Sequence, residues 1–171
     1  KEIIIGAAPV LASRIGYVGE LGFELHIPSE FAIHVYKELW QSGQEMDIAN
    51  VGYRAIESLR MEKGYLYWSG DISPDYSPLE AGLGFRVHFD LKDDFLGRQA
   101  LENQMKNGLD RKLFTFVSEQ FLPLTGGETI LESDRVVSLA TSVAYGFTVK
   151  KTIIRGYLDR LYWGKTEFTV E

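Results

Sequence analysis

Closely spaced short β segments after Gly108 constrain the fold of this chain more than any other feature. Five such segments are separated by turn residues: Leu113–Val117, Glu128–Leu131, Val136–Ala140, Ala144–Val149 and Thr152–Leu158. This spacing is typical of a small antiparallel barrel or sandwich. Before Gly108, strand and helix patterns are mixed. The sequence therefore predicts an α+β fold, with one domain over residues 1–108 and a small antiparallel β domain over residues 109–171.

The segment Phe23–Ile27 alternates strictly between apolar and polar residues, which predicts a half-buried strand. Its apolar side chains share one face, and Glu24 and His26 share the other. Short β-favouring runs at Ile3–Ile5 and Val10–Ile15 precede it. Between these segments lies a loop with glycines at positions 16, 19 and 22, which fits neither a dinucleotide fingerprint nor a phosphate loop. We assign these glycines to turns.

Helices are expected where apolar residues recur at helical spacing. The first follows Ser29, a candidate N-cap, and ends near Gly43. The others are expected over Gly52–Lys63 and Gly97–Lys106. A loop rich in Gly, Pro, Ser and Asp is expected over Gly64–Leu83, followed by a strand over Gly84–Phe89.

Composition narrows the classes of function. The 171 residues include 18 Lys and Arg against 24 Asp and Glu, a net charge of −6 that argues against a nucleic-acid binder. No apolar run approaches the roughly 20 residues of a membrane span. Without cysteine, the chain has no disulfide framework, thiolate metal site or cysteine nucleophile. The three histidines lack metal-ligand spacing, and the acidic residues Asp71, Asp75 and Glu80 are interpreted as turn formers, so no metal is expected.

Glu24 is the candidate binding residue that the pattern offers. A carboxylate on a strand has a direction set by the pleat, and its two oxygens can accept two parallel N–H bonds from an amidine-like heterocycle. Tyr17 and Phe85 could supply the apolar surface that such a ring needs. The alternative interpretation is that Glu24 is an ordinary solvent-facing glutamate and that Tyr17 and Phe85 pack in the core.

Four segments, in order along the chain, carry a resemblance to a known family: Arg14–Leu25, Ser58–Gly64, Ser77–Phe85 and Asp94–Leu101. They resemble the tetrahydrofolate-binding aminomethyltransferases, the T-proteins of glycine cleavage. The later Tyr145-Gly146-Phe147 and Lys151–Tyr157 segments are similar to the C-terminal barrel of that family. The resemblance implies a T-protein-like folate-binding domain followed by a barrel.

Details such as Met61–Tyr65 and Phe95–Arg98 resemble the C-terminal folate module of sarcosine and dimethylglycine dehydrogenases. In those flavoenzymes an N-terminal FAD domain oxidises an N-methyl amine, and the folate module captures the one-carbon unit as 5,10-methylenetetrahydrofolate. Two alternatives stay open. One is a stand-alone aminomethyltransferase working with a lipoyl carrier protein, and the other is a non-catalytic relative, like the regulatory subunit of pyruvate dehydrogenase phosphatase.

By position, Glu24 matches the pterin-binding glutamate of the family, and Tyr17 matches a tyrosine that contacts folate. Phe85 falls where relatives place an aromatic residue beside the ligand, and Leu25 and His26 would line the same wall. The chain departs from the T-proteins at Ile56, where they carry an arginine that contacts folate. Arg54 or Arg60 could compensate, but Arg60 matches the other arginine of that motif, so neither inherits the role.

The ends of the chain lie inside strand patterns, so we expect a fragment of a longer polypeptide. The catalytic Asp of the family and the FAD domain would then lie upstream of Lys1, and no catalytic residue is assigned within residues 1–171. The resemblance implies tetrahydrofolate as cofactor, FAD in the N-terminal domain and a small N-methyl amine as substrate. It also implies the mitochondrial matrix in a eukaryote or the cytoplasm in a bacterium.

Overall fold

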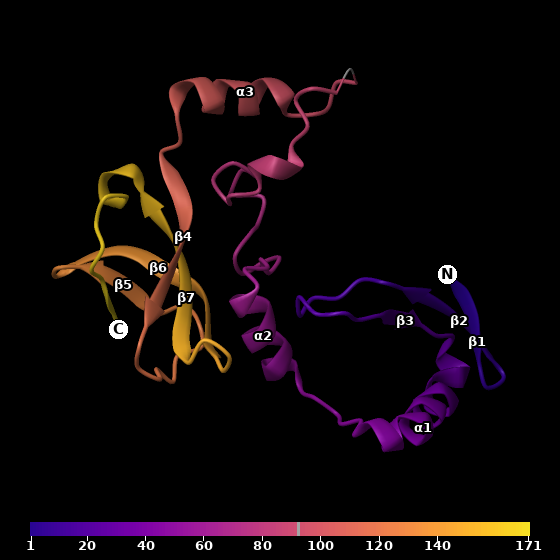
Figure 1. Cartoon of the computed structure of the whole chain (residues 1–171). Coiled ribbons are helices and arrows are strands. Elements are labelled where there is room, and N and C mark those ends of the chain that lie inside the picture. Colours follow the sequence, from indigo (N-terminus) through magenta and orange to yellow (C-terminus); the bar gives the residue numbers. More distant parts are fainter. Residues whose placement is uncertain (92) are drawn as a thin grey trace. The chain divides into compact units, whose positions relative to one another are not determined.

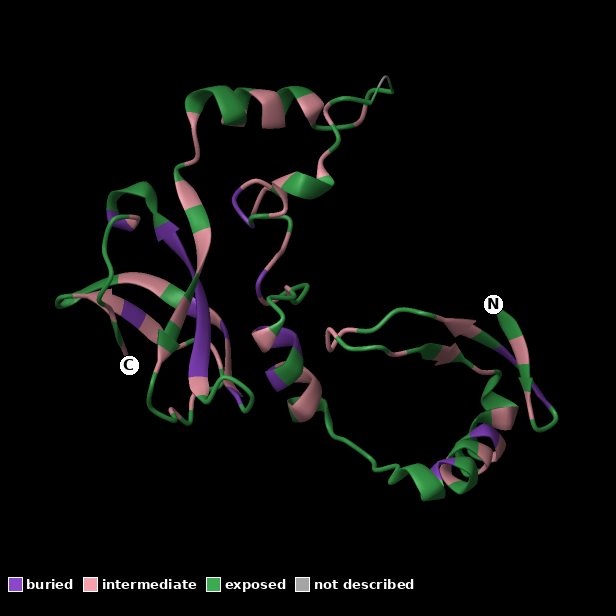
Figure 2. Ribbon diagram, viewed as in Figure 1, coloured by how far each residue is buried: buried purple, intermediate pink, exposed green. Residues whose placement is uncertain are grey.

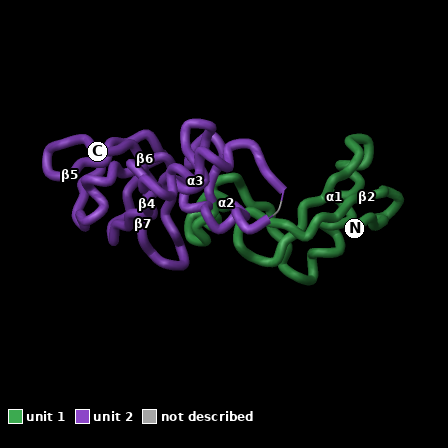
Figure 3. The backbone as a smooth tube through the Cα atoms, turned by 90° about the horizontal axis from the view of Figure 1, so that it is seen from above, with its two compact units in different colours: residues 1–65 green, residues 66–171 purple. Residues whose placement is uncertain are grey.

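The computed structural model describes residues 1–91 and 93–171, drawn in Figure 1. They form two compact units, residues 1–65 and residues 66–171 (Figure 3). Helices and antiparallel sheets are both present, so the expected α+β fold is confirmed.

The first unit is built on a three-stranded antiparallel sheet in the order β1-β2-β3. Its elements, in chain order, are β1 (Glu2–Ile5), β2 (Ala8–Ser13), β3 (Glu24–His26), η1 (Ser29–Phe31), α1 (Ala32–Gly43), η2 (Gln44–Met46) and α2 (Tyr53–Glu62). Strand β2 and helix α1 share a core in which Ala8, Val10 and Val35 are buried, and Leu25 and Ile27 pack against it. The predicted helix over Gly52–Lys63 is confirmed as α2.

The second unit contains a five-stranded sheet in the order β4-β7-β6-β5-β8, with every pair antiparallel. Its elements, in chain order, are η3 (Gly84–Arg86), α3 (Arg98–Asn107), β4 (Arg111–Ser118), β5 (Thr129–Glu132), β6 (Arg135–Gly146), β7 (Lys151–Asp159), η4 (Arg160–Tyr162) and β8 (Thr169–Val170). Ile130, Ala140 and Ile154 form the buried centre. Strand β7, which lies between β4 and β6 in the sheet, is buried from Thr152 to Leu158 (Figure 2).

Three local predictions were wrong. The strand expected over Gly84–Phe89 is the 3-10 turn η3, in which the Val87 amide donates to the Gly84 carbonyl at 3.0 Å. The two strands expected around Ala140 and Ala144 are one strand, β6, whose register shifts between Ala140 and Ser142. Ser29 does not cap α1, because it opens the preceding turn η1.

The loop expected over Gly64–Leu83 is confirmed as turns and bends. Residues 66–107 nevertheless group with the five-stranded sheet rather than with residues 1–65. Part of the reason is that the Leu113 amide, on β4, donates to the Glu80 carbonyl at 2.9 Å. The domain boundary at Gly108 stays a prediction.

Candidate functional site

The glycine-punctuated loop between β2 and β3 packs against the end of α2. Gly19 has φ +74°, and a Cβ at this position would lie 2.0 Å from Cγ of Lys63. The Lys63 ammonium in turn lies 3.2 Å from Oε1 of Glu20. Glycine at position 19 is therefore required both by its backbone conformation and by the close approach of Lys63.

Tyr17, in the same loop, is partly buried. Its ring stacks on that of Tyr65, with centroids 6.1 Å apart and planes 19° from parallel. This contact holds Tyr17 in place and brings together two loop segments of the first unit.

Strand β3 presents Glu24 and His26 on one face. Both residues are exposed, with Glu24 paired in register to Ser13 and His26 to Leu11 of β2. Leu25 points the other way and packs against the core formed by β2 and α1. Glu24 and His26 thus share a face, as predicted, whereas the Leu25 side chain does not line a common wall with them.

Phe23 is 59% exposed, so it does not join Leu25 and Ile27 in the core as its place in the alternation predicted. The reason is that β3 begins only at Glu24, so the pleat does not extend to residue 23.

Phe85 belongs to the second unit, on η3, and its side chain is 69% exposed. The Arg86 guanidinium carbon lies 5.1 Å from the centroid of the Phe85 ring. Its exposure excludes the alternative that Phe85 is a core aromatic of this unit.

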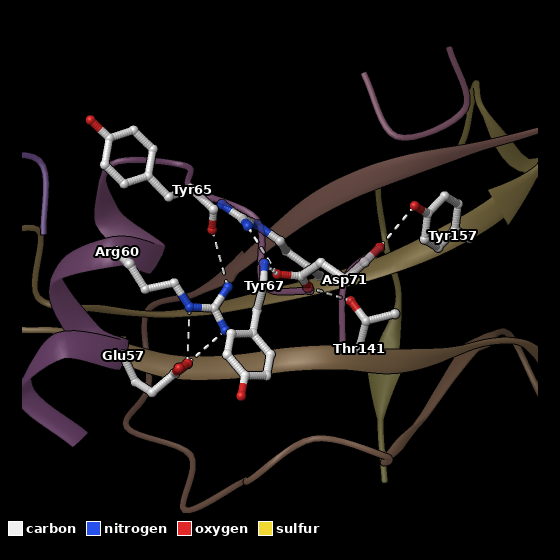
Figure 4. Close-up of polar contacts among 8 residues, drawn as sticks. Glu57, Arg60, Tyr65, Tyr67, Asp71, Thr141 and Tyr157 are labelled. Atoms are coloured by element: carbon white, nitrogen blue, oxygen red, sulfur yellow. Dashed lines mark hydrogen bonds and ion pairs between the residues drawn. The ribbon is translucent and has the colours of Figure 1, made fainter. Parts of the chain in front are cut away.

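Arg60, one of the two arginines that could have compensated for Ile56, is held inside the protein. Its side chain is 2% exposed and donates to Oε2 of Glu57 from Nε at 2.9 Å and from Nη2 at 2.6 Å (Figure 4). Its Nη1 donates to the Tyr65 carbonyl at 3.1 Å. Arg60 therefore ties α2 to the segment that follows it and does not present its guanidinium to a ligand.

A buried polar network centres on Asp71, which is 0% exposed. The carboxylate accepts hydrogen bonds from the Thr141 hydroxyl at 2.7 Å and the Tyr67 amide at 2.9 Å, and it pairs with the Arg155 guanidinium at 3.2 Å (Figure 4). The Tyr157 hydroxyl donates to the Asp71 carbonyl at 2.8 Å. Asp71 thus fastens the 66–83 loop to strands β6 and β7.

Sequence reasoning missed this network, because it interpreted Asp71 as a turn former. One signal was available. Arg155 interrupts the otherwise apolar run of β7 at a position where the strand is buried, and a buried arginine requires an anionic partner.

The Asp71 carboxyl has a pKa below its ordinary value of 3.8. Burial by itself raises this pKa, but hydrogen bonds from Thr141, Tyr67 and Ser142 and the charge of Arg155 outweigh it. Burial also raises the pKa of the Tyr157 phenol, whose hydroxyl donates to the Asp71 backbone carbonyl.

The lowered pKa of Asp71 predicts a dependence of stability on pH. A carboxyl with a depressed pKa contributes stability above its unfolded value, and this contribution is lost as pH falls through the folded value. We expect the free energy of unfolding to fall from roughly pH 5 downward, and to fall less steeply in Asp71→Asn. Urea titrations of both proteins across this range measure the difference. Equal slopes would contradict a lowered pKa at Asp71.

Within the part of the chain that the structure describes, no group of three or more His, Cys, Asp or Glu side chains could hold a metal ion. Over the same residues, no helix combines the length and the apolar character that crossing a bilayer would need.

Comparisons with known proteins match both halves of the chain. The GCVT N-terminal domain matches residues 1–91, and the glycine cleavage T-protein C-terminal barrel domain matches residues 111–171. A crystal structure of glycine cleavage system aminomethyltransferase T from Bartonella henselae superimposes with a TM-score of 0.80 at 26% identity. The match covers 96% of this chain and 45% of that one.

Two dehydrogenases are also similar. Mitochondrial sarcosine dehydrogenase of Mus musculus is 45% identical over 149 residues, which cover 87% of this chain and 16% of the relative. Mitochondrial dimethylglycine dehydrogenase of Homo sapiens is 36% identical over 160 residues, 92% of this chain and 18% of the relative. The chain thus spans less than a fifth of either dehydrogenase. With both family domains matched in order and the T-protein fold reproduced, the chain belongs to the glycine cleavage T-protein (aminomethyltransferase) family.

Proposed function

We propose that this chain is the tetrahydrofolate-binding C-terminal portion of an FAD-dependent enzyme like sarcosine or dimethylglycine dehydrogenase. In that role it passes the one-carbon unit of an N-methyl amine to tetrahydrofolate. The similarity to the two dehydrogenases supports this choice within the family.

The observation that carries the proposal is the placement of Glu24. Its carboxylate stands on the exposed face of β3, while Leu25 behind it is anchored in the core. A carboxylate held in this way can accept two parallel hydrogen bonds, and the 2-amino and N3 hydrogens of a pterin offer two such donors. Residues of this chain therefore fit the pterin edge of tetrahydrofolate.

Tyr17 and His26 belong to the same proposed folate site as Glu24, with Leu25 supporting the strand from behind. Phe85, in the second unit, is proposed as a folate contact from its position in the sequence alone. Stacking on Tyr65 fixes the Tyr17 ring, which offers an apolar surface to a bound ring system. FAD, when bound, supplies the oxidation of the amine. We propose that it belongs to a domain N-terminal to Lys1, together with the catalytic Asp of the family.

Glu24→Gln in the full polypeptide tests the proposal. Glutamine keeps the size of the side chain but loses the charge, and it places an NH₂ group against an N–H donor of the ligand. Charge-assisted bonds contribute roughly 1.5–3 kcal/mol, so tetrahydrofolate affinity should fall by about tenfold to a few hundredfold. Calorimetry measures the dissociation constant. Release of free formaldehyde during amine oxidation should rise, because capture of the one-carbon unit fails.

Glu2→Gln is the matched control, because Glu2 is an exposed glutamate on β1 of the same sheet. It should bind tetrahydrofolate like the wild type. If Glu24→Gln binds tetrahydrofolate as tightly as Glu2→Gln does, Glu24 is only a solvated strand residue and the proposal fails.

A stand-alone aminomethyltransferase is the second candidate, favoured by the similarity to the Bartonella henselae aminomethyltransferase T. It would require a lipoyl carrier protein and no flavin. The full-length sequence separates the two, since a dinucleotide fingerprint upstream of Lys1 supports the dehydrogenase and its absence supports the transferase. A non-catalytic regulatory relative, the third candidate, would show no turnover. In a eukaryote the proposed enzyme works in the mitochondrial matrix, and in a bacterium in the cytoplasm.

A further inference from the structure

Helix α3 ends in the only Asn-Gly pair of the sequence, Asn107 and Gly108. Asn107 is exposed. The Gly108 amide, unlike the amides that follow α1 and α2, donates to no acceptor among the residues that the structure describes. Gly108 has φ +84° and no Cβ, which leaves the space around its nitrogen open. A side-chain amide thus stands next to an unbonded backbone amide.

The end of α3 is weakly held. None of the residues of this helix is buried, and Met105, in its last turn, is 58% exposed. An element with few buried contacts opens locally at small cost in free energy. Such opening lets Asn107 leave its helical backbone conformation, so that Cγ of its side chain can approach the Gly108 nitrogen.

A cation lies beside this pair. A Cβ at Gly108 would be 3.3 Å from Nη1 of Arg160. The Arg160 backbone is held at this place, because its amide donates to the Asp110 carbonyl at 2.7 Å. The guanidinium forms no ion pair with a carboxylate within residues 1–91 and 93–171. A positive charge here favours loss of the amide proton and stabilises the oxyanion that forms when the nitrogen attacks a carbonyl carbon.

We propose that Asn107 is a site of spontaneous deamidation in the folded protein, promoted by Arg160. The Gly108 nitrogen bonds to Cγ of Asn107, its proton passes to water, and ammonia leaves. Water then opens the resulting succinimide ring at either carbonyl, which gives aspartate or isoaspartate. The product carries a new carboxylate at the end of α3, and isoaspartate also adds one methylene to the backbone ahead of β4.

The two other asparagines of the chain are protected by their surroundings. The residue after Asn103 is Gln104, whose amide lies inside α3 and is engaged in the helix. The residue after Asn50 is Val51, whose branched side chain hinders approach to its own nitrogen. Both asparagines therefore serve as internal references for Asn107.

The test follows deamidation of the folded full polypeptide in warm, mildly alkaline buffer. Cleavage after glutamate places Asn103 and Asn107 in one peptide, residues 103–119, and fragment masses locate the gain of about 1 Da. Asn107 should react at least about tenfold faster than Asn103 or Asn50, because the Gln104 amide must first break a hydrogen bond. Comparable rates at all three positions overturn the inference.

The same chain unfolded in urea is the reference for the effect of the fold. Asn107 should react at least as fast in the folded protein as in urea, because the helix end is open and Arg160 assists. If folding slows the reaction at Asn107 by about tenfold, the helix end protects this residue and the inference is overturned.

Arg160→Gln tests the role of the cation. In the folded protein it should slow deamidation of Asn107 by about fivefold at low salt, and less as salt rises. It should change nothing in urea. Arg135→Gln, which removes an exposed arginine from β6, is the matched control and should react like the wild type. Equal rates in the two variants overturn the role of Arg160.

Asn107→Gln identifies the product. Glutamine keeps a side-chain amide but must close a larger ring, so this variant should form no isoaspartate. An isoaspartyl methyltransferase should therefore label the incubated wild type and not the incubated variant. Equal labelling of both proteins would place the modification elsewhere in the chain and would overturn the inference.

Discussion

Replacing Asp71 by alanine should lower the free energy of unfolding by about 3–5 kcal/mol, because it leaves the Arg155 guanidinium buried without its counter-ion. Arg155 is 2% exposed, so water cannot solvate the charge without opening the sheet. Thr141 and the Tyr67 amide lose their acceptor as well. Urea unfolding followed by circular dichroism measures the loss.

Asp75→Ala is the control for this prediction. Asp75 lies in the same loop but is exposed, and its carboxylate accepts a hydrogen bond from the Ser73 hydroxyl at 3.0 Å. The free energy of unfolding of Asp75→Ala should stay within about 1 kcal/mol of the wild-type value. Adding Arg155→Met to Asp71→Ala should recover part of the stability, because an apolar side chain of similar length replaces the unpaired charge. No recovery, together with a small effect of Asp71→Ala, would show that the pair is not buried.

Replacing Arg60 by methionine should destabilise the protein by about 2–4 kcal/mol, less than the full effect of breaking a buried pair because Glu57 is 23% exposed. The change removes both hydrogen bonds to Glu57 and the one to the Tyr65 carbonyl. The end of α2 then keeps its backbone hydrogen bond from the Tyr65 amide to the Arg60 carbonyl but loses the side-chain link to Tyr65, the residue on which Tyr17 stacks. Thermal and urea unfolding measure the effect.

Arg54→Met provides the comparison, because Arg54 is exposed on the same helix. Its free energy of unfolding should stay within about 0.5 kcal/mol of the wild type. The pair of variants also decides what Arg60 does. If Arg60→Met weakened tetrahydrofolate binding with no loss of stability, Arg60 would be a ligand contact and the structural role assigned to it would be wrong.

Patterns within a few residues predicted the regular elements well. The alternation around Glu24 predicted β3 and the shared face of Glu24 and His26, and helical spacing predicted α2. These features depend on hydrogen bonds and side-chain directions that repeat locally, so the sequence carries them directly. Glu24 and Tyr17 emerged as candidates because their motifs are local too, and their folate role remains a prediction.

Predictions of elements that depend on a second, distant segment of the chain were less accurate. Gly84–Phe89 has a strand-like composition, yet Arg86 and Val87 donate to carbonyls three residues back, which forms η3 instead. Composition can favour extended backbone, but a strand also requires a neighbouring strand in register. Position 85 therefore came to lie at a pocket rather than in a sheet.

Sequence alone determined the α+β class, the run of antiparallel strands after Gly108 and the direction in which Glu24 points, since each follows from short-range periodicity. Tertiary structure alone decided the role of Asp71, whose carboxylate meets Thr141 and Arg155 across 70 and 84 residues of chain. It also gathered Phe85, Lys112 and Arg160 around one pocket. The physical reason is that burial and pairing of charges depend on which distant segments pack together, and no local pattern encodes that.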